Sequence, residues 1–358
     1  MRLLSYLVLP LAVVAAYLLF WPVPIEPQMW EPPPLPGPRH PYNEALRAVE
    51  RIGEGQGVGP EGIAVDDQGR LYAGFIDGRV VRMNADGSAP TLLAETGGRP
   101  LGLGFAPDGS VLVADATHGL LQVGADGGLT TLADAADGVP FKLADDVDRA
   151  QGSDKAYFSD ASSKYPLPDL MAEVFEHRPH GRLLEYDFGT RQTRVLLSDL
   201  YFANGVAVGP DEAYVLVTET TRYRVTRYWL KGERAGTSEV FIDNLPGFPD
   251  NISFNGSDRF WLALYAPRTS ALDALLPRPY LRRVIFRLPH ALHPKPKLHG
   301  WVLGLDLDGN VVADLQYAGD GAFGPVTSVE QAGDTLYLGS LSDTAIGRLP
   351  LSALTGAP

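Results

Sequence analysis

The segment Gly62-Ile63-Ala64-Val65-Asp66 is followed by a polar turn and then by a second apolar segment, Leu71-Tyr72-Ala73-Gly74. The same unit, an alternating apolar segment, a turn and a stronger apolar segment, recurs along the chain. Its first segments begin at residues 62, 102, 146, 205, 251 and 326. Such short segments also occur in sandwiches and barrels, but spaced repetition of one multi-strand unit favours a β-propeller. Six copies predict an all-β fold, a six-bladed β-propeller.

The last unit ends after its third apolar segment, near residues 346–349. A propeller must close its ring of blades, so the missing outer strand of this blade has to come from elsewhere in the domain. Residues 46–52, at the start of the domain, are the candidates. We therefore predict that the two ends of a propeller domain spanning 43–358 pair with each other.

The N-terminal residues 3–20 carry no charged side chain and are about long enough to span a membrane as a helix. Trp-Pro-Val-Pro at 21–24 is a poor signal-peptidase site, which favours an uncleaved transmembrane signal-anchor helix over 1–21 rather than a cleaved signal. Arg2 precedes this stretch and acids follow it from Glu26. The positive-inside rule then predicts a single-pass protein with its domain on the non-cytoplasmic side: periplasm, secretory lumen or cell surface.

Residues 22–42 are proline-rich, with nine prolines among the twenty residues from Pro22 to Pro41. Proline at this density favours an extended, semi-rigid polyproline segment and is incompatible with a packed helix or strand. We interpret residues 22–42 as a stalk between the helix and the propeller.

The composition excludes several classes of function. Thirty Lys and Arg against 43 Asp and Glu give a net charge of −13, which argues against nucleic-acid binding. The absence of cysteine excludes disulfide scaffolds, thiolate zinc sites, iron-sulfur clusters and cysteine nucleophiles. Any metal must be held by oxygen or histidine ligands.

The residue just before the first segment of each unit shares one structural frame. These residues are Glu61, Leu101, Asp145, Asn204, Asp250 and Pro325. Equivalent positions of a propeller surround the mouth of its central channel, so four oxygen-bearing side chains should converge there. Such hard ligands match Ca²⁺, or less well Mg²⁺. Asn251 and Asp146 follow two of them as further donors. Turn formation explains any single Asp or Asn at such a place, but it does not explain the shared frame or Glu61.

Two loops expected at the same end of the propeller are enlarged, and we name 161–181 the first lid and 266–300 the second lid. The second lid is rich in cations and has one acid, Asp273, in an otherwise acidic chain; the cations are Arg268, Arg278, Arg282, Arg283, Arg287, Lys295 and Lys297. One hypothesis is that this lid rests on an anionic membrane. The alternative is a solvated surface helix.

His118 lies in a loop of the second unit that is expected to face the same end. Imidazole titrates near neutrality, so His118 is a candidate general base. The alternative is a solvent-facing turn histidine.

Longer motifs carry a resemblance. They are Gly59-Pro60-Glu61-Gly62, the stretch from Tyr157 to Tyr165 (YFSDASSKY), Phe202-Ala203-Asn204-Gly205 and the stretch from Leu245 to Asn251 (LPGFPDN). With these motifs the folded domain resembles the strictosidine synthase-like family. It is more distantly similar to paraoxonases and to the senescence marker protein/gluconolactonase group, which are six-bladed calcium-dependent propellers.

The resemblance implies calcium ligands at Glu61, Asn204 and Asp250, with the paraoxonase pattern adding Asn251. Asp145 stands where the family usually has asparagine, a change that retains a ligand oxygen. The amine-condensing synthases use a glutamate that pairs here with Thr327. Glu330 is out of register, so this Pictet-Spengler chemistry is not expected.

Together these observations predict a membrane-anchored, calcium-dependent hydrolase of lactones or activated esters, of the arylesterase or lactonase type. Asp250 is the first candidate for base or nucleophile, and His118 is the second candidate base. A noncatalytic binding propeller locked by calcium, or a condensing enzyme of the synthase type, are the alternatives.

Overall fold

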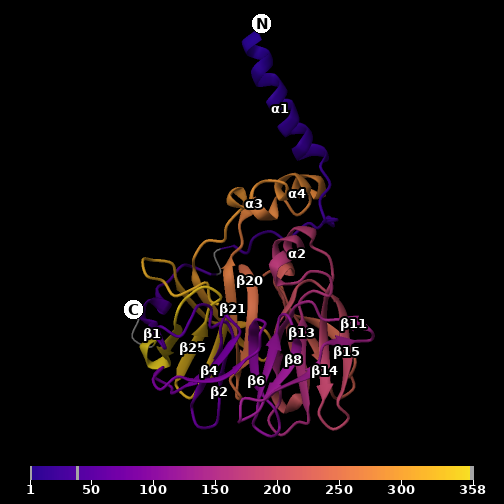
Figure 1. Cartoon of the computed structure of the whole chain (residues 1–358). Helices are drawn as coiled ribbons and strands as arrows, with labels where there is room; N and C mark the ends of the chain where they lie inside the picture. The colour runs from indigo at the N-terminus through magenta and orange to yellow at the C-terminus, as the bar shows by residue number, and fades with distance from the viewer. Residues whose placement is uncertain (1, 38–39, 355–358) are drawn as a thin grey trace.

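The computed structural model of the chain describes residues 2–37 and 40–354, with side chains described from residue 9 onward. Six four-stranded antiparallel sheets are arranged around a central axis (Figure 1). The predicted six-bladed β-propeller is therefore confirmed.

Each blade is an antiparallel sheet with its first strand innermost, and blades 1 to 5 are simple meanders. Blade 1 is β2 (Ile63–Val65), β3 (Leu71–Gly74), β4 (Arg79–Met83) and β5 (Thr91–Glu95). Blade 2 is β6 (Pro100–Phe105), β7 (Val111–Asp115), β8 (Gly119–Val123) and β9 (Leu129–Ala133). Blade 3 is β12 (Ala144–Asp148), β13 (Lys155–Asp160), β14 (Gly181–Asp187) and β15 (Gln192–Leu200).

Blade 4 is β16 (Ala203–Val208), β17 (Tyr214–Glu219), β18 (Arg224–Trp229) and β19 (Ser238–Ile242). Blade 5 is β20 (Gly247–Phe254), β21 (Arg259–Pro267), β22 (Gly300–Asp306) and β23 (Val311–Tyr317). Blade 6 is β24 (Ser328–Ala332), β25 (Thr335–Gly339), β26 (Ile346–Pro350) and β1 (Glu50–Ile52). A short hairpin, β10 (Ala135–Ala136) and β11 (Val139–Pro140), joins blades 2 and 3.

The turn between the first two strands of blade 1 shows how the local sequence makes these hairpins. Asp66 accepts hydrogen bonds from the backbone amides of Gln68 and Arg70 at 3.0 and 2.9 Å. Gly69 has a φ of +74°, which glycine adopts without steric cost. Asp66 is thus a turn former at the end of the propeller opposite the lids.

The ring closes as the sequence predicts, because β1 pairs with β26 in blade 6. Glu50 lies opposite Arg348, and their side chains form an ion pair at 2.6 Å. The strand is shorter than the expected 46–52, since residues Ala45–Ala48 form a 3₁₀ turn. That turn buries Leu46 against the core between blades 5 and 6.

An α-helix, α1 (Arg2–Phe20), projects away from the propeller at the lid end (Figure 1). The predicted transmembrane segment 1–21 lies partly outside the described residues, because the side chains of residues 1–8 are not described. Within the described part of the chain, no helix combines the length and apolarity needed to cross a bilayer.

The proline-rich segment 22–42, which we call the strap, makes contacts with the rest of the protein through its described residues. The Glu26 amide donates to the Glu176 carboxylate at 2.8 Å, and the Gln28 amide donates to the Glu176 carbonyl at 2.9 Å. Ile25 is 1% exposed, between α2 (Leu170–Glu176) of the first lid and the second lid. The described residues of the strap form no helix or strand, and the sequence pattern alone did not indicate these contacts.

Arg282 joins the strap to both lids. It belongs to α4 (Pro279–Phe286), which follows α3 (Ser270–Asp273) in the second lid. Its guanidinium donates to the carbonyls of Phe175 at 2.9 Å, of Leu276 at 3.1 Å and of Gln28. Burial lowers the pKa of Arg282 to about 10, and its side chain is only 1% exposed. One buried cation therefore satisfies carbonyl groups from three separate segments.

We expect Arg282→Leu to loosen the strap, because it leaves these buried carbonyls without a donor. The cost should be about 3 kcal/mol of stability, from unsatisfied buried acceptors. Hydrogen exchange at the Gln28 and Trp30 amides, which bond to Glu176 and Leu276, measures the effect directly. Arg278→Leu, at an exposed residue just before α4, is the control. Equal exchange in the two variants would contradict the role given to Arg282.

Candidate functional site

Five predicted donor residues lie at the entry of the inner strands, at the lid end of the channel. Glu61 precedes β2, Asp145 and Asn204 lie at the starts of β12 and β16, and Asp250 and Asn251 lie in β20. All five are buried, with exposed fractions of 2–6%. Blades 1, 3, 4 and 5 therefore each contribute a buried oxygen-bearing side chain to one ring, which we call the donor ring.

A hydrogen bond connects two members of the donor ring across the axis. The Asn251 side-chain amide donates from Nδ2 to Glu61 Oε1 at 2.9 Å, which links blade 5 to blade 1. The side chain of Asn204 lies near the Asp250 carboxylate and acts against the rise in its pKa.

Hydroxyl groups of neighbouring strands fix the backbone that carries the donors. Ser328 Oγ donates to the Glu61 carbonyl at 2.5 Å, and Thr218 Oγ1 donates to the Asp250 carbonyl at 2.9 Å. The donor ring is thus held by the blades and not by flexible loops.

The carboxyl groups of the donor ring repel one another in a buried environment. Burial raises the pKa of Glu61 to about 7, although the nearby Arg99 guanidinium opposes the shift. Burial and the charge of Glu61 hold the pKa values of Asp145 and Asp250 well above their usual range. Concentrated negative charge of this kind is stabilised by a bound cation.

The donor ring also contains buried acceptor atoms without a donor. Glu61 Oε2, Asn204 Oδ1 and Asn251 Oδ1 are inaccessible to solvent and have no hydrogen-bond partner among the described residues. An orphaned buried acceptor is costly unless something satisfies it. No three His, Asp or Glu side chains of the described chain meet closely enough to hold a metal by themselves. The amides stand between the carboxylates, so the residues fit a hard cation held by a mixed carboxylate and carboxamide set.

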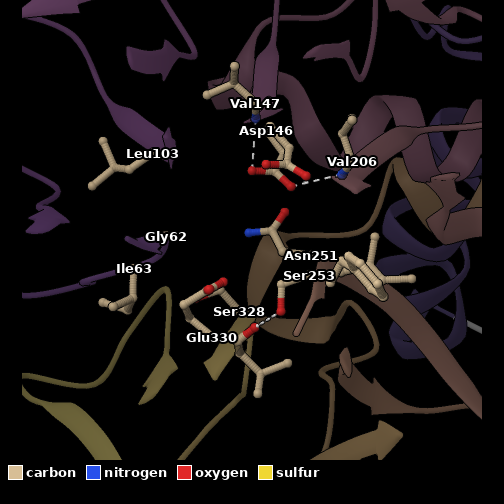
Figure 2. A pocket seen from close by; sticks show the side chains of 14 residues that line it. Gly62, Ile63, Leu103, Asp146, Val147, Val206, Asn251, Ser253, Ser328 and Glu330 are labelled. Carbon is tan, nitrogen blue, oxygen red and sulfur yellow. Dashed lines mark hydrogen bonds between the residues drawn. The ribbon is translucent and has the colours of Figure 1, made fainter. Parts of the chain in front are cut away.

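Below the donor ring, the central channel contains a cavity of about 90 Å³ lined by the inner strands (Figure 2). Asp146 faces this cavity from β12, and its carboxylate accepts hydrogen bonds from the Val147 and Val206 amides at 2.9 and 2.8 Å. Asn251, Ser253 and Glu330 line the same cavity. Asp146 thus ties blade 3 to blade 4 beneath the ring, a role that its neighbour Asp145 does not share.

Glu330 lies within this channel and provides a pH-dependence test. Burial, followed by repulsion from Asp148 and Asp146, raises the pKa of Glu330 to about 8 from 4.5. The folded state therefore holds a proton that the unfolded chain releases, and the associated stability is lost as pH rises from about 4.5 through 8. Glu330→Gln stays neutral and should avoid this loss.

We expect the variant to gain about 2–4 kcal/mol relative to the parent chain across that range. Melting temperatures measured with chelator present, from acidic to mildly alkaline pH, check the prediction. Parallel curves for the two proteins would rule out the titration of Glu330 in this window.

Sequence reasoning missed Arg99, which lies beside Glu61. Arg99 is 5% exposed, and its Nη1 donates to the Gly59 carbonyl at 2.9 Å, whereas its Nη2 is buried without a partner. Gly59 has a φ of +71°, and a Cβ there would lie 2.9 Å from Arg99 Nη2 and 2.6 Å from the Leu341 carbonyl. The signal in the sequence was the glycine two residues before Glu61, whose lack of a side chain admits the guanidinium.

The histidines occupy different environments. His118 is exposed at the lid end, where its backbone amide donates to Asp115 at 3.0 Å; within the described chain its ring bonds to no donor-ring residue. His177 of the first lid is buried, and its ring stacks on Trp30 of the strap at 4.7 Å. Burial holds the pKa of His177 well below its usual value, so it remains neutral. The structure places His118 in the loop between β7 and β8 and outside the donor ring.

Known proteins resemble this chain in sequence. The strictosidine synthase family model matches residues 145–233, and the strictosidine synthase-like N-terminal model matches residues 38–83. Strictosidine synthase-like 4 from Arabidopsis thaliana is 41% identical over 314 residues, covering 86% of this chain and 83% of the relative. Adipocyte plasma membrane-associated protein from Homo sapiens is 36% identical over 356 residues, covering 92% and 85%.

Solved structures agree on the fold. A gluconolactonase from Xanthomonas campestris superposes with a TM-score of 0.61 at 16% identity, covering 92% of this chain and 97% of that one. The calcium-binding protein regucalcin from Agrobacterium tumefaciens gives a TM-score of 0.58 at 18% identity, covering 84% and 92%. At these identities the likeness shows the propeller fold alone. The two relatives found by sequence, at 41% and 36% identity, are similar to this chain over most of their length. The chain therefore belongs to the strictosidine synthase-like family.

Proposed function

We propose that the protein is a calcium-dependent hydrolase of lactones or activated esters. Glu61, Asp145, Asn204, Asp250 and Asn251 would hold the ion. The observation that carries this proposal is the set of three buried, unpartnered oxygen acceptors among mutually repelling carboxyl groups. Mg²⁺ is a poorer match, because it demands a near-ideal octahedral geometry that a ring of fixed blade positions does not readily supply.

The chain's own residues divide the work of hydrolysis. A bound calcium ion supplies a positive charge that polarises the substrate carbonyl and stabilises the oxyanion. Asp250, fixed through its backbone carbonyl by Thr218, is the carboxylate that accepts the proton of the attacking water or attacks directly. The nearby side-chain amide of Asn204 favours the charged form of this carboxylate. His118 is the second candidate base at the entrance.

Apolar side chains at the lid end support a carbon-rich substrate. Leu101 lies at the start of β6, and Leu143 and Phe202 precede β12 and β16. The three belong to one buried cluster, against which Leu341 of blade 6 packs. We propose that this cluster excludes water beside the donor ring and forms an apolar wall for the hydrocarbon part of an ester or lactone.

The test is a substrate panel. Phenyl acetate, a γ-lactone, a δ-lactone and paraoxon are incubated with the full chain in calcium. Turnover of at least one member supports the proposal and ranks the substrate classes. A folded, calcium-binding protein that turns over none of them would favour a noncatalytic, calcium-locked binding propeller.

The condensing activity of the synthases is not favoured by the geometry. Thr327, which pairs with their catalytic glutamate, is fully buried and donates to the Glu61 carbonyl at 3.2 Å. A hydroxyl committed to a structural hydrogen bond does not replace a carboxylate base.

We also propose that α1 attaches the protein to a membrane, with the propeller on the non-cytoplasmic side. Its described apolar residues are exposed, with Leu9, Leu11 and Val13 at 69%, 67% and 61%. The name of the human relative, plasma membrane-associated, agrees with this proposal.

A further inference from the structure

We propose that the outer surface of the second lid docks on an anionic lipid bilayer, next to the point where α1 leaves it. The proposal builds on attachment through α1 but concerns a different surface, formed by α4 and the segment that follows it. Figure 1 shows α3 and α4 between the propeller and α1.

The cations of the second lid have two separate roles in the structure. Arg268 pairs with Asp273 at 2.8 Å, while Arg282 and Arg287 are buried and donate to backbone carbonyls. These three guanidinium groups hold the fold together. Arg278, Lys295 and Lys297 instead are exposed, and none forms an ion pair within the described chain, although Arg278 also donates to the Ala274 carbonyl. Arg283 is half-buried. A locally unpaired positive surface is thus exposed on a protein whose net charge is −13.

Large apolar side chains are exposed on the same lid. Tyr280 and Leu281 on α4 are 55% and 39% exposed, and Leu292 and Leu298 beyond it are 64% and 53% exposed. Apolar groups interleaved with cations are typical of a surface that inserts shallowly between anionic headgroups. Exposed cations alone, or single exposed apolar side chains alone, are compatible with a water-facing surface. Their combination favours the interface of a bilayer.

Contacts with α1 fix where this surface lies. Arg287 donates to the Trp21 carbonyl at 2.6 Å and to the Leu18 carbonyl at 2.8 Å, and Tyr280 donates to the Leu19 carbonyl at 3.2 Å. The last turn of α1 is therefore attached to α4. Phe20 and Trp21 at this junction are 78% and 61% exposed, and such residues favour a membrane interface. A bilayer that receives α1 would meet α4 next.

The absence of cysteine allows a direct test with single-cysteine variants of the full chain. Leu292→Cys places an environment-sensitive fluorophore on the second lid, and Leu11→Cys places one on α1. Val312→Cys, on β23 at the opposite end of the same blade and 51% exposed, is the control. Each protein is mixed with vesicles of phosphatidylcholine alone or of phosphatidylcholine with phosphatidylserine.

We expect the probe at position 292 to shift to the blue with phosphatidylserine vesicles, to shift less with phosphatidylcholine, and to lose the difference in high salt. The probe at position 312 should not respond. An unshifted probe at position 292 would overturn the proposal, whether or not the probe at position 11 enters the bilayer.

A charge-matched pair of variants separates a lid surface from general charge effects. Lys295→Gln with Lys297→Gln should weaken the response at position 292 about tenfold. Arg191→Gln with Arg234→Gln removes two exposed cations from turns at the opposite end and should leave the response unchanged. Equal losses in the two variants would contradict docking through the lid.

Hydrolysis of a water-soluble ester by the lid variant distinguishes this proposal from the proposed function. We expect it to be unchanged, because neither lysine belongs to the donor ring. Loss of docking with intact hydrolysis is what the proposal predicts for this variant.

Discussion

Asp250→Asn is expected to lower hydrolysis by about 10³-fold or more while the propeller remains folded. The substitution keeps the shape of the side chain and one ligand oxygen, but it removes the charge that accepts a proton or attacks the substrate. The backbone of Asp250 keeps its hydrogen bond from Thr218, so the strand should not move. Steady-state kinetics on the best substrate of the panel measure the effect.

A matched control comes from the same blade. Asp258→Asn changes an exposed aspartate in the turn at the other end of the inner strand, where its carboxylate contacts Asn255. This variant should retain full activity and a normal melting temperature. Full activity in Asp250→Asn would remove Asp250 from the mechanism, and unfolding of that variant would show a structural role instead.

Glu61→Gln should weaken calcium binding about 100-fold, because calcium affinity depends on the number of ligand charges. Glu61 contributes one unpartnered oxygen and bonds to Asn251 through the other. The glutamine retains similar volume, so the neighbouring backbone should persist. Titration calorimetry with calcium chloride gives the affinity directly.

Glu54→Gln is the control for this measurement, since Glu54 is an exposed glutamate in the loop that precedes blade 1. We expect its calcium affinity to match that of the parent chain. Unchanged binding in Glu61→Gln would exclude Glu61 as a ligand and would require a different site for the ion.

The fold was predictable because its information is local and repeated. The spacing from Ile63 to Leu71 recurs in each blade with a polar turn between the two segments, so one unit identifies the architecture. The same register placed Glu61 and Asn204 in one frame, although they are far apart in sequence. The pairing of β1 with blade 6 was predictable because the sixth repeat lacks a fourth strand.

Contacts between segments without a repeat were not predictable. The strap has the composition of a free polyproline spacer, yet Glu176 and Arg282 bind its backbone. The groups bound are a backbone amide and a backbone carbonyl, which the side-chain sequence does not distinguish. Arg99 approaches Glu61 only because Gly59 leaves room, which depends on tertiary packing. The basic residues of the second lid also looked alike in sequence, and only burial separates the structural cations from the exposed ones.

The most direct test of the account compares hydrolysis by the full chain in calcium, after chelation, and after calcium or magnesium is restored. We predict that chelation abolishes turnover, that calcium restores it and that magnesium restores it poorly. Melting temperature measured in parallel shows whether the chelated protein is still folded. Turnover that persists unchanged in a protein stripped of calcium would contradict the account.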